Sequence, residues 1–290
     1  MERQECRYYQ RQDDGRVECQ LCPHHCRIAD GKTGICQSRR NHHGILVSEV
    51  YSRPCALAVD PVEKKPLYHF HPGTKCLSVA CTGCNFRCLN CQNYDISQVA
   101  PSEVPHYDLS PDDLVSLCQE HRCPSIAYTY TEPLTYIEYV TDTARKAHEA
   151  GLYNILVTAG YVCAEPLADL LPYLDAANVD LKSFSDEIYQ RVSGGHLSTV
   201  LDTILAMRDA GVWIEITNLV IPQVNDDLQM IRSMCRWLVA NSLADAPLHF
   251  SRFFPRFKMQ DIPPTPLSTL RSARQVAQEE GITHVYLGNV

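Results

Sequence analysis

The stretch KCLSVACTGCNFRCLNCQN, residues 75–93, joins a short β-rich run to four closely spaced cysteines, Cys81, Cys84, Cys88 and Cys91. From this run onward, β-rich segments alternate regularly with helical patterns, which predicts a parallel sheet covered by helices. Further predicted strands lie at 125–131, 153–160, 176–183, 212–222, 247–254 and 283–289. Six strand–helix units favour an α/β fold of the partial (βα)6 TIM-like barrel type over the eight units of a closed barrel.

The helical segments between these strands carry boundary signals. Segment 110–121 begins with Ser110 as an N-cap and has acidic residues in its first turn, and segment 134–151 ends in basic residues and Gly151. The other helical patterns cover 165–174, 197–211, 226–241 and 267–281. Each therefore supplies the crossover that a parallel sheet requires.

Residues 1–75 lack this alternation and hold a second cysteine group, Cys19, Cys22, Cys26 and Cys36. A segment this short and irregular gains little stability from core burial, so a bound metal is expected to staple it. We therefore expect a small Cys-rich N-terminal metal-binding extension over 1–75 and the partial barrel over 76–290.

Composition narrows the class of protein. Lys and Arg total 26 against 34 Asp and Glu, and a net charge of −8 argues against a general nucleic-acid-binding surface. No window approaches the run of about 20 apolar residues that a membrane span needs, and the N-terminus has no signal-peptide core. We expect a cytoplasmic protein whose 15 cysteines are reduced thiols and metal ligands rather than disulfides.

Two metal sites are conceivable for the quoted cysteines. A zinc site would pair Cys81 and Cys84 with Cys88 and Cys91, but three residues between the pairs are too few for the usual finger or ribbon. Three thiolates at 84, 88 and 91 instead suit a [4Fe–4S] cluster, in which one iron then stays open to another ligand. On this hypothesis Cys81 is a spare thiol and not a ligand of the cluster.

The spacing C-x3-C-x2-C after the first strand of such a barrel resembles the hallmark of the radical SAM superfamily. Over nearly the whole chain the sequence resembles the AmmeMemoRadiSam system radical SAM enzymes, relatives of pyruvate formate-lyase activating enzymes. The similar motifs are CQLCPHHC (19–26), GKTGIC (31–36), PLYHFHPG (66–73), GCNFRCLNCQN (83–93), AYTYTEP (127–133), VDLKSFSDEIY (179–189) and HFSRFFPRFKM (249–259). One departure is Asn90, where the superfamily usually has an aromatic residue before the last cluster cysteine.

The resemblance implies an enzyme that cleaves S-adenosylmethionine (SAM) reductively at a [4Fe–4S] cluster and forms a 5′-deoxyadenosyl radical that abstracts hydrogen from a substrate. The resemblance suggests a protein or peptide as this substrate. An electron donor such as flavodoxin or ferredoxin is implied with it. An activase that installs a glycyl radical on a partner enzyme is an alternative. A non-catalytic iron–sulfur or zinc scaffold is an alternative of another class, although inward polar residues argue against it.

Reactive groups of a βα barrel lie at the C-terminal ends of its strands, and the resemblance suggests SAM contacts there. Thr131 and Glu132 are candidates for the SAM amino group, with a loop-capping role as the alternative for Glu132. Thr158 is a candidate for the SAM ribose or methionine end, or an ordinary turn residue. The remaining candidates are Asp180 and Lys182, either near SAM or as a structural ion pair, His249 near SAM, and Arg252 near a substrate or the SAM carboxylate.

The N-terminal group has the spacing C-x2-C-x3-C-x9-C, a full set of four ligands. Four thiolates close the coordination sphere, so the site is either structural zinc or an auxiliary iron–sulfur cluster. Spacing does not separate these two alternatives, and closed sites in small irregular segments favour a structural metal slightly.

Overall fold

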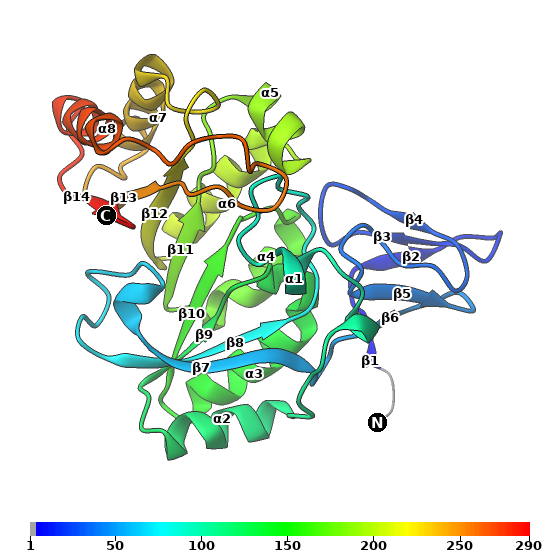
Figure 1. Ribbon diagram of the computed structural model, residues 1–290. Coiled ribbons are helices and arrows are strands. Elements are labelled where there is room, and N and C mark those ends of the chain that lie inside the picture. Colours follow the sequence, from blue (N-terminus) through cyan, green and yellow to red (C-terminus); the bar gives the residue numbers. More distant parts are fainter. Residues whose placement is uncertain (1–3) are drawn as a thin grey trace.

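An eight-stranded sheet forms the centre of the molecule (Figure 1). The computed structural model describes residues 4–290. Seven strands run parallel and in chain order: β8 (Lys75–Cys81), β9 (Ser125–Tyr128), β10 (Tyr153–Thr158), β11 (Ala176–Asp180), β12 (Trp213–Val220), β13 (Leu248–Arg252) and β14 (Val285–Gly288). The predicted α/β fold with a parallel sheet is confirmed, and each predicted strand is present: β8 covers 75–81 against a predicted 75–80, and the other six are shorter than predicted.

Helices cover the outer side of this sheet. The longer ones are α2 (Pro111–Glu120), α3 (Ile137–Glu149), α4 (Ala164–Leu170), α6 (Leu197–Asp209), α7 (Leu228–Ala240) and α8 (Leu267–Glu279). Short elements are η1 (Val62–Lys64), α1 (Tyr94–Ser97), η2 (Pro101–Glu103), η3 (Pro133–Tyr136), η4 (Leu171–Tyr173), α5 (Asp186–Ile188) and the π-helical η5 (Tyr189–Ser193). Ser110 caps α2 as predicted, because its hydroxyl accepts a hydrogen bond from the Asp113 N–H.

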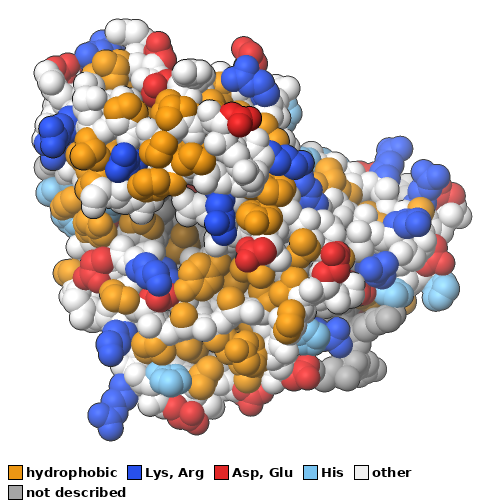
Figure 2. All heavy atoms as spheres, viewed as in Figure 1, with side chains coloured by type: hydrophobic (Ala, Val, Ile, Leu, Met, Phe, Trp, Pro, Cys, Tyr) orange, Lys and Arg blue, Asp and Glu red, His pale blue; other side chains and the backbone are white. Residues whose placement is uncertain are grey.

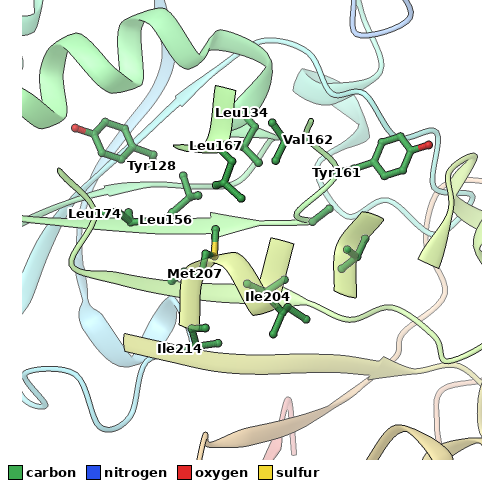
Figure 3. Packing of buried hydrophobic residues seen from close by; sticks show 14 of the residues in the cluster. Tyr128, Leu134, Leu156, Tyr161, Val162, Leu167, Leu174, Ile204, Met207 and Ile214 are labelled. Carbon is green, nitrogen blue, oxygen red and sulfur yellow. The ribbon is translucent and has the colours of Figure 1, made fainter. Parts of the chain in front are cut away.

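The core lies between the sheet and these helices. Ile204 and Met207 of α6 are buried in one hydrophobic cluster with Leu156 of β10 and Ile214 of β12, and Figure 3 labels all four side chains. Burying aliphatic side chains of this size contributes about 1.5–3 kcal/mol each. This packing fixes the strands, and so it fixes the loops at their C-terminal ends.

The eighth strand was not predicted. β7 (Pro54–Pro61) pairs antiparallel with β8, so the sheet begins inside the segment that was assigned to the extension. Its buried Asp60 hid the pattern, since a charged residue interrupts the expected run of apolar residues. Asp60 is satisfied by Lys65, whose ammonium nitrogen lies 2.7 Å away, and by the Ser78 hydroxyl at 2.9 Å. The two-domain division itself stays a prediction.

The connection between β7 and β8, residues 62–74, forms a floor to the barrel. Because β7 runs against β8, this connection lies at the N-terminal ends of the parallel strands. Val62 and Leu67 pack there with Ile155 and other inward-facing residues, and the Asn178 amide donates a 2.8 Å hydrogen bond to the Pro66 carbonyl. The loop that carries Cys84, Cys88 and Cys91, residues 82–93, follows β8 at the opposite end, so the two ends of the barrel are structurally distinct.

The N-terminal extension is more regular than its sequence indicated. It contains two small antiparallel sheets, one of β1 (Gln4–Glu5), β6 (Ile45–Ser48) and β5 (Arg39–His42), and one of β2 (Tyr9–Arg11), β3 (Val17–Cys19) and β4 (Arg27–Ile28). Figure 1 shows both sheets beside the barrel, in blue. Their buried residues, such as Val17 and Leu46, belong to the same hydrophobic cluster as the barrel.

The surface agrees with the composition. On the face drawn in Figure 2, basic and acidic side chains are interspersed and form no broad basic field. No helix among residues 4–290 is both long and apolar enough to cross a bilayer.

Candidate functional site

The cluster loop, residues 82–93, follows β8 and is held from several sides. The Arg87 and Leu89 backbone N–H groups donate hydrogen bonds to the carbonyls of Ser193 and Val192, at 2.8 and 2.9 Å. The Asn93 amide donates a 2.6 Å hydrogen bond to the carbonyl of Tyr130, beyond the end of β9. The loop that carries the three predicted ligands is therefore fixed to its neighbours by backbone contacts.

The thiols of Cys84, Cys88 and Cys91 are close enough to influence one another. Burial raises the pKa of Cys84, and the neighbouring Glu132, Cys88 and Cys91 raise it further. Burial also raises the pKa of Cys88, while the Lys182 ammonium opposes this rise. Binding to a metal centre would therefore release protons from these thiols.

Cys81 lies apart from this group. It is the last residue of β8, is completely buried, and belongs to the hydrophobic core. Within residues 4–290, moreover, no three Cys, His, Asp or Glu side chains are arranged to hold a single metal ion. The place of Cys81 in the core separates it from the loop, and Cys84, Cys88 and Cys91 stay as the predicted thiol set for an iron–sulfur cluster.

Glu132 and Thr158 meet at the ends of β9 and β10. The Thr158 hydroxyl donates a 2.6 Å hydrogen bond to the Glu132 carboxylate, which also accepts hydrogen bonds from the backbone N–H groups of Ala159 and Leu134. Burial raises the pKa of Glu132, while these hydrogen bonds oppose the rise. The bond from Leu134 is the capping role considered above, and the bond from Thr158 places two predicted SAM contacts together.

Thr131 lies beside the strand that leads into the cluster loop. Its hydroxyl donates a 2.7 Å hydrogen bond to the carbonyl of Cys81. Because this hydroxyl donates to a backbone carbonyl, it links the segment after β9 to the end of β8. A SAM contact from Thr131 stays a prediction.

Asp180 and Lys182 form an ion pair of 2.9 Å at the end of β11, where both are partly exposed. Burial by itself lowers the pKa of Lys182, but the Asp180 carboxylate beside it leaves that pKa raised. The same ammonium opposes the raised pKa values of Cys88 and Glu132. The predicted pair is therefore present, and its cation lies near two other candidates.

His249 pairs with a buried carboxylate, and its predicted place near SAM stays a prediction. Its Nε2 lies 2.7 Å from a carboxylate oxygen of Glu215, and both residues are buried in the barrel. Burial raises the pKa of Glu215, but hydrogen bonds from His249 and from the backbone N–H groups of Tyr68 and His69 leave it below its usual value. Since Tyr68 and His69 belong to the floor, His249 lies at the end of the barrel opposite the cluster loop.

Arg252 ends β13 on the side of the cluster loop. Its Nε donates a 2.8 Å hydrogen bond to the Thr265 carbonyl, and its guanidinium lies 4.9 Å from the centre of the Phe254 ring. These contacts hold the side chain in place. Its predicted role near a substrate or the SAM carboxylate stays a prediction.

The four N-terminal cysteines line one cavity. Cys19, Cys22, Cys26 and Cys36 surround a volume of about 10 Å³, together with Arg39 and Asn85. The sequence predicted that these thiols converge, but it did not indicate that Asn85, the residue after Cys84, reaches the same cavity.

Sequence reasoning also missed Gly83 and Tyr130. Gly83 has a φ of +109°, and a Cβ atom there would lie 2.4 Å from the Cys36 carbonyl oxygen. Tyr130 has a φ of +65°, and its hydroxyl donates a hydrogen bond to Asp60 inside the barrel. The glycine directly before the predicted ligand Cys84 in CTGC was the available sequence signal for Gly83. No sequence signal indicated Tyr130.

A sequence profile described as the radical SAM superfamily matches residues 78–235, which contain the end of β8, the cluster loop and all of β9 to β12. The chain belongs to the radical SAM superfamily. In a βα barrel the reactive groups lie at the C-terminal strand ends, which is where Glu132, Thr158 and Asp180 are found. Members of this superfamily use a [4Fe–4S] cluster and SAM, and this chain is accordingly an enzyme with these cofactors.

The similar proteins include an uncharacterized protein of Methanocaldococcus jannaschii, 44% identical over 99% of this radical SAM chain and 85% of that protein. Pyruvate formate-lyase 1-activating enzyme of Escherichia coli K12 is 28% identical over 50% of this chain. The alignment spans only 61% of that activating enzyme. Among solved structures, a radical SAM methyltransferase from Sphaerobacter thermophilus shares the fold with a TM-score of 0.59 and 13% identity, over 76% of this chain and 68% of that one.

The residues present fit these cofactors. Cys84, Cys88 and Cys91, three thiols on one loop, would provide the donor set of such an iron–sulfur cluster. Nearby polar groups such as Glu132 and Asp180 suit the charged amino acid part of SAM, because buried ammonium and carboxylate groups need charged or hydrogen-bonding partners.

Proposed function

We propose that Cys84, Cys88 and Cys91 hold the [4Fe–4S] cluster and that this enzyme abstracts hydrogen from a protein or peptide. When bound, the cluster and SAM supply the chemistry, a one-electron cleavage of SAM that gives a 5′-deoxyadenosyl radical. The observation that carries the proposal is the meeting of this thiol loop with the Glu132–Thr158 pair and the Asp180–Lys182 pair at neighbouring strand ends.

The protein residues have separate roles in this proposal. The Glu132 carboxylate, held by Thr158 and by backbone N–H groups, faces the site as a preorganised acceptor for an ammonium group. Lys182 supplies positive charge beside Cys88, where it favours the thiolate form that a metal centre requires. The core packing of β8–β11 holds these groups in place without further ordering.

A protein substrate is supported by similarity to pyruvate formate-lyase activating enzymes, which covers half of this chain. A glycyl-radical activase is therefore the second candidate, and membership of the AmmeMemoRadiSam family is the finer proposal from sequence. In either case a flavodoxin- or ferredoxin-like protein is the proposed electron donor.

The test is SAM cleavage by anaerobically reconstituted protein with dithionite. We expect 5′-deoxyadenosine from the native chain and from Cys81→Ala, a matched control whose thiol lies in the core, and none from Cys88→Ala. Absence of cleavage by the native chain would support a non-catalytic scaffold. Equal cleavage by Cys88→Ala would refute the ligand assignment.

A second measurement addresses the substrate. Extract of the source organism is separated by dialysis, and each fraction is added to the cleavage assay. Stimulation of 5′-deoxyadenosine formation by the macromolecular fraction is expected, and the stimulation should be lost when that fraction is treated with protease. Stimulation by the small-molecule fraction alone would overturn the proposal of a protein or peptide substrate.

A further inference from the structure

A short basic and aromatic segment, residues 252–261, packs against the cluster loop. It begins at the end of β13 and reads RFFPRFKMQD, with three basic residues and one acidic residue, in a chain whose net charge is −8. The Lys258 backbone N–H donates a 2.9 Å hydrogen bond to the carbonyl of Leu89, which lies between Cys88 and Cys91 in the chain. Figure 1 shows this segment, in orange, running from β13 toward the cluster loop.

The inner side of the segment is apolar and is fixed on the barrel. Phe253 and Met259 are buried in one small hydrophobic cluster with Val192 of η5, and Leu89 of the cluster loop packs against this cluster. The segment is therefore anchored on both sides of residues 254–258, which project from a fixed base.

The outer side of the segment is an ordered set of rings and cations. The Phe257 ring stacks on the ring of Tyr94, the residue after the cluster loop, with 4.7 Å between the ring centres. The Arg256 guanidinium lies 5.5 Å from the centre of the Tyr94 ring, and the Lys258 ammonium lies 5.2 Å from the centre of the Phe257 ring. Phe257 has a φ of +53°, a backbone conformation that costs a bulky residue about 1–3 kcal/mol, so the surrounding contacts must hold this turn in place.

The two cations of this turn have no carboxylate partner. Arg256 and Lys258 are exposed, and neither forms an ion pair in the part of the chain that the structure describes. Phe254 beside them is 44% exposed. We call Tyr94, Phe254, Arg256, Phe257 and Lys258 the basic–aromatic surface. Its unpaired cations attract acidic partners to this place, while the net negative charge of the chain disfavours such partners elsewhere.

We propose that the basic–aromatic surface docks an acidic electron-donor protein of the flavodoxin or ferredoxin kind. In the complex the donor loses one electron and the SAM cluster gains it. The inference rests on the proposed function in one respect, the assignment of that cluster to Cys84, Cys88 and Cys91. Redox complexes are transient, with small interfaces that form by electrostatic steering, and unpaired cations around exposed rings suit such an interface.

The position of the surface favours a donor over the substrate. A substrate must reach the strand ends of the barrel, where Glu132 and Asp180 lie, whereas a donor has only to approach the cluster loop from solvent. Arg256 and Lys258 are exposed and belong to the turn that hydrogen-bonds to this loop at Leu89.

Binding of oxidised flavodoxin to the reconstituted native chain is the first test, with a ferredoxin measured in parallel by calorimetry. We expect the affinity of the native chain to fall about tenfold or more from low to high salt, because charge guides the docking. Failure of both donors to bind, or binding that is independent of salt, would overturn the inference. This measurement requires no substitution.

Two matched double variants then locate the binding surface. At about 0.1 M salt, where charges act over about 10 Å, Arg256→Glu with Lys258→Glu should weaken binding about tenfold or more. Arg271→Glu with Arg274→Glu makes the same change of charge at two exposed, unpaired cations of α8, which Figure 1 shows away from the cluster loop, and should have little effect. Circular dichroism checks that each variant is folded, and the salt dependence of the native chain decides if one is not. Equal effects of the two double variants would overturn the inference.

SAM cleavage separates this inference from the proposed function. Dithionite is a small reductant that needs no docking surface, so cleavage with dithionite should be the same in the native chain and in Arg256→Glu with Lys258→Glu. Cleavage driven by reduced flavodoxin should fall about tenfold or more in this variant. No cleavage by the native chain with dithionite would refute the proposed function and leave the binding test of the surface intact. Unchanged flavodoxin-driven cleavage, or a folded variant that loses only its stimulation by the macromolecular fraction, would overturn the docking of a donor here.

Discussion

Substitution of Gly83 by alanine probes the contact between the cluster loop and Cys36, one of the four cysteines that line the N-terminal cavity. At a φ of +109° alanine is strained by about 1–3 kcal/mol. Its Cβ would lie 2.4 Å from the Cys36 carbonyl oxygen, and moving packed atoms to relieve such an overlap costs about 1–3 kcal/mol more. We expect Gly83→Ala to lower the free energy of unfolding by about 2–6 kcal/mol, against a typical total of about 5–15 kcal/mol.

Gly15→Ala is the matched control. Gly15 also has a left-handed backbone, with φ of +77°, but nothing lies within 4 Å of the position of its Cβ. Only the backbone term applies there, about 1–2 kcal/mol. Both variants are compared with the native chain by thermal unfolding of the metal-loaded protein, on a scale of about 2–4 °C per kcal/mol. Gly83→Ala should unfold at the lower temperature, and equal shifts would refute the close packing on Cys36.

Three further predictions concern buried carboxylates. Burial raises the pKa of Asp60, but hydrogen bonds from its neighbours leave this pKa well below its usual value. The stabilisation from the Asp60 carboxylate is therefore present above about pH 4 and is lost as the pH falls below that value. We expect the urea midpoint of Asp60→Asn to change less between pH 5 and 3 than the midpoint of the native chain. Glu138→Gln leaves the Arg39 guanidinium buried without its counter-ion and should cost about 3–5 kcal/mol in urea unfolding, whereas Glu187→Gln, in an exposed pair, should cost less than about 1 kcal/mol. Glu132→Gln should weaken SAM binding about tenfold or more in calorimetry, and unchanged affinity would leave Glu132 with only its capping role.

The sequence predicted most of the barrel because its strands and helices differ clearly in pattern and length. It missed β7 because Asp60 interrupts the apolar run and prolines occupy both ends. It also missed the N-terminal sheets, since strands of two to four residues are too short to show a period. Local pattern identifies an element only when enough residues repeat it.

In the site, the thiol spacing and the polar residues at the strand ends could be identified from the sequence, because each pattern involves residues that are close together in the chain. The place of His249 near the floor was not identifiable, because a strand pattern gives the direction of the chain but not the depth at which the strand enters a sheared barrel. The contacts of Gly83 with Cys36 and of His24 with Asn85 join segments distant in sequence, so only the fold shows them.

The floor of the barrel is synthesised long before the side chains that hydrogen-bond to it. Residues 66–69 leave the ribosome early, but the Asn178 and Glu215 side chains that bind them follow 112 and 147 residues later. At about 5–20 residues per second, the hairpin of β7 and β8 waits many seconds for its permanent partners. During that interval the two cysteine-bearing segments on either side of this hairpin, 19–36 and 82–93, are already synthesised.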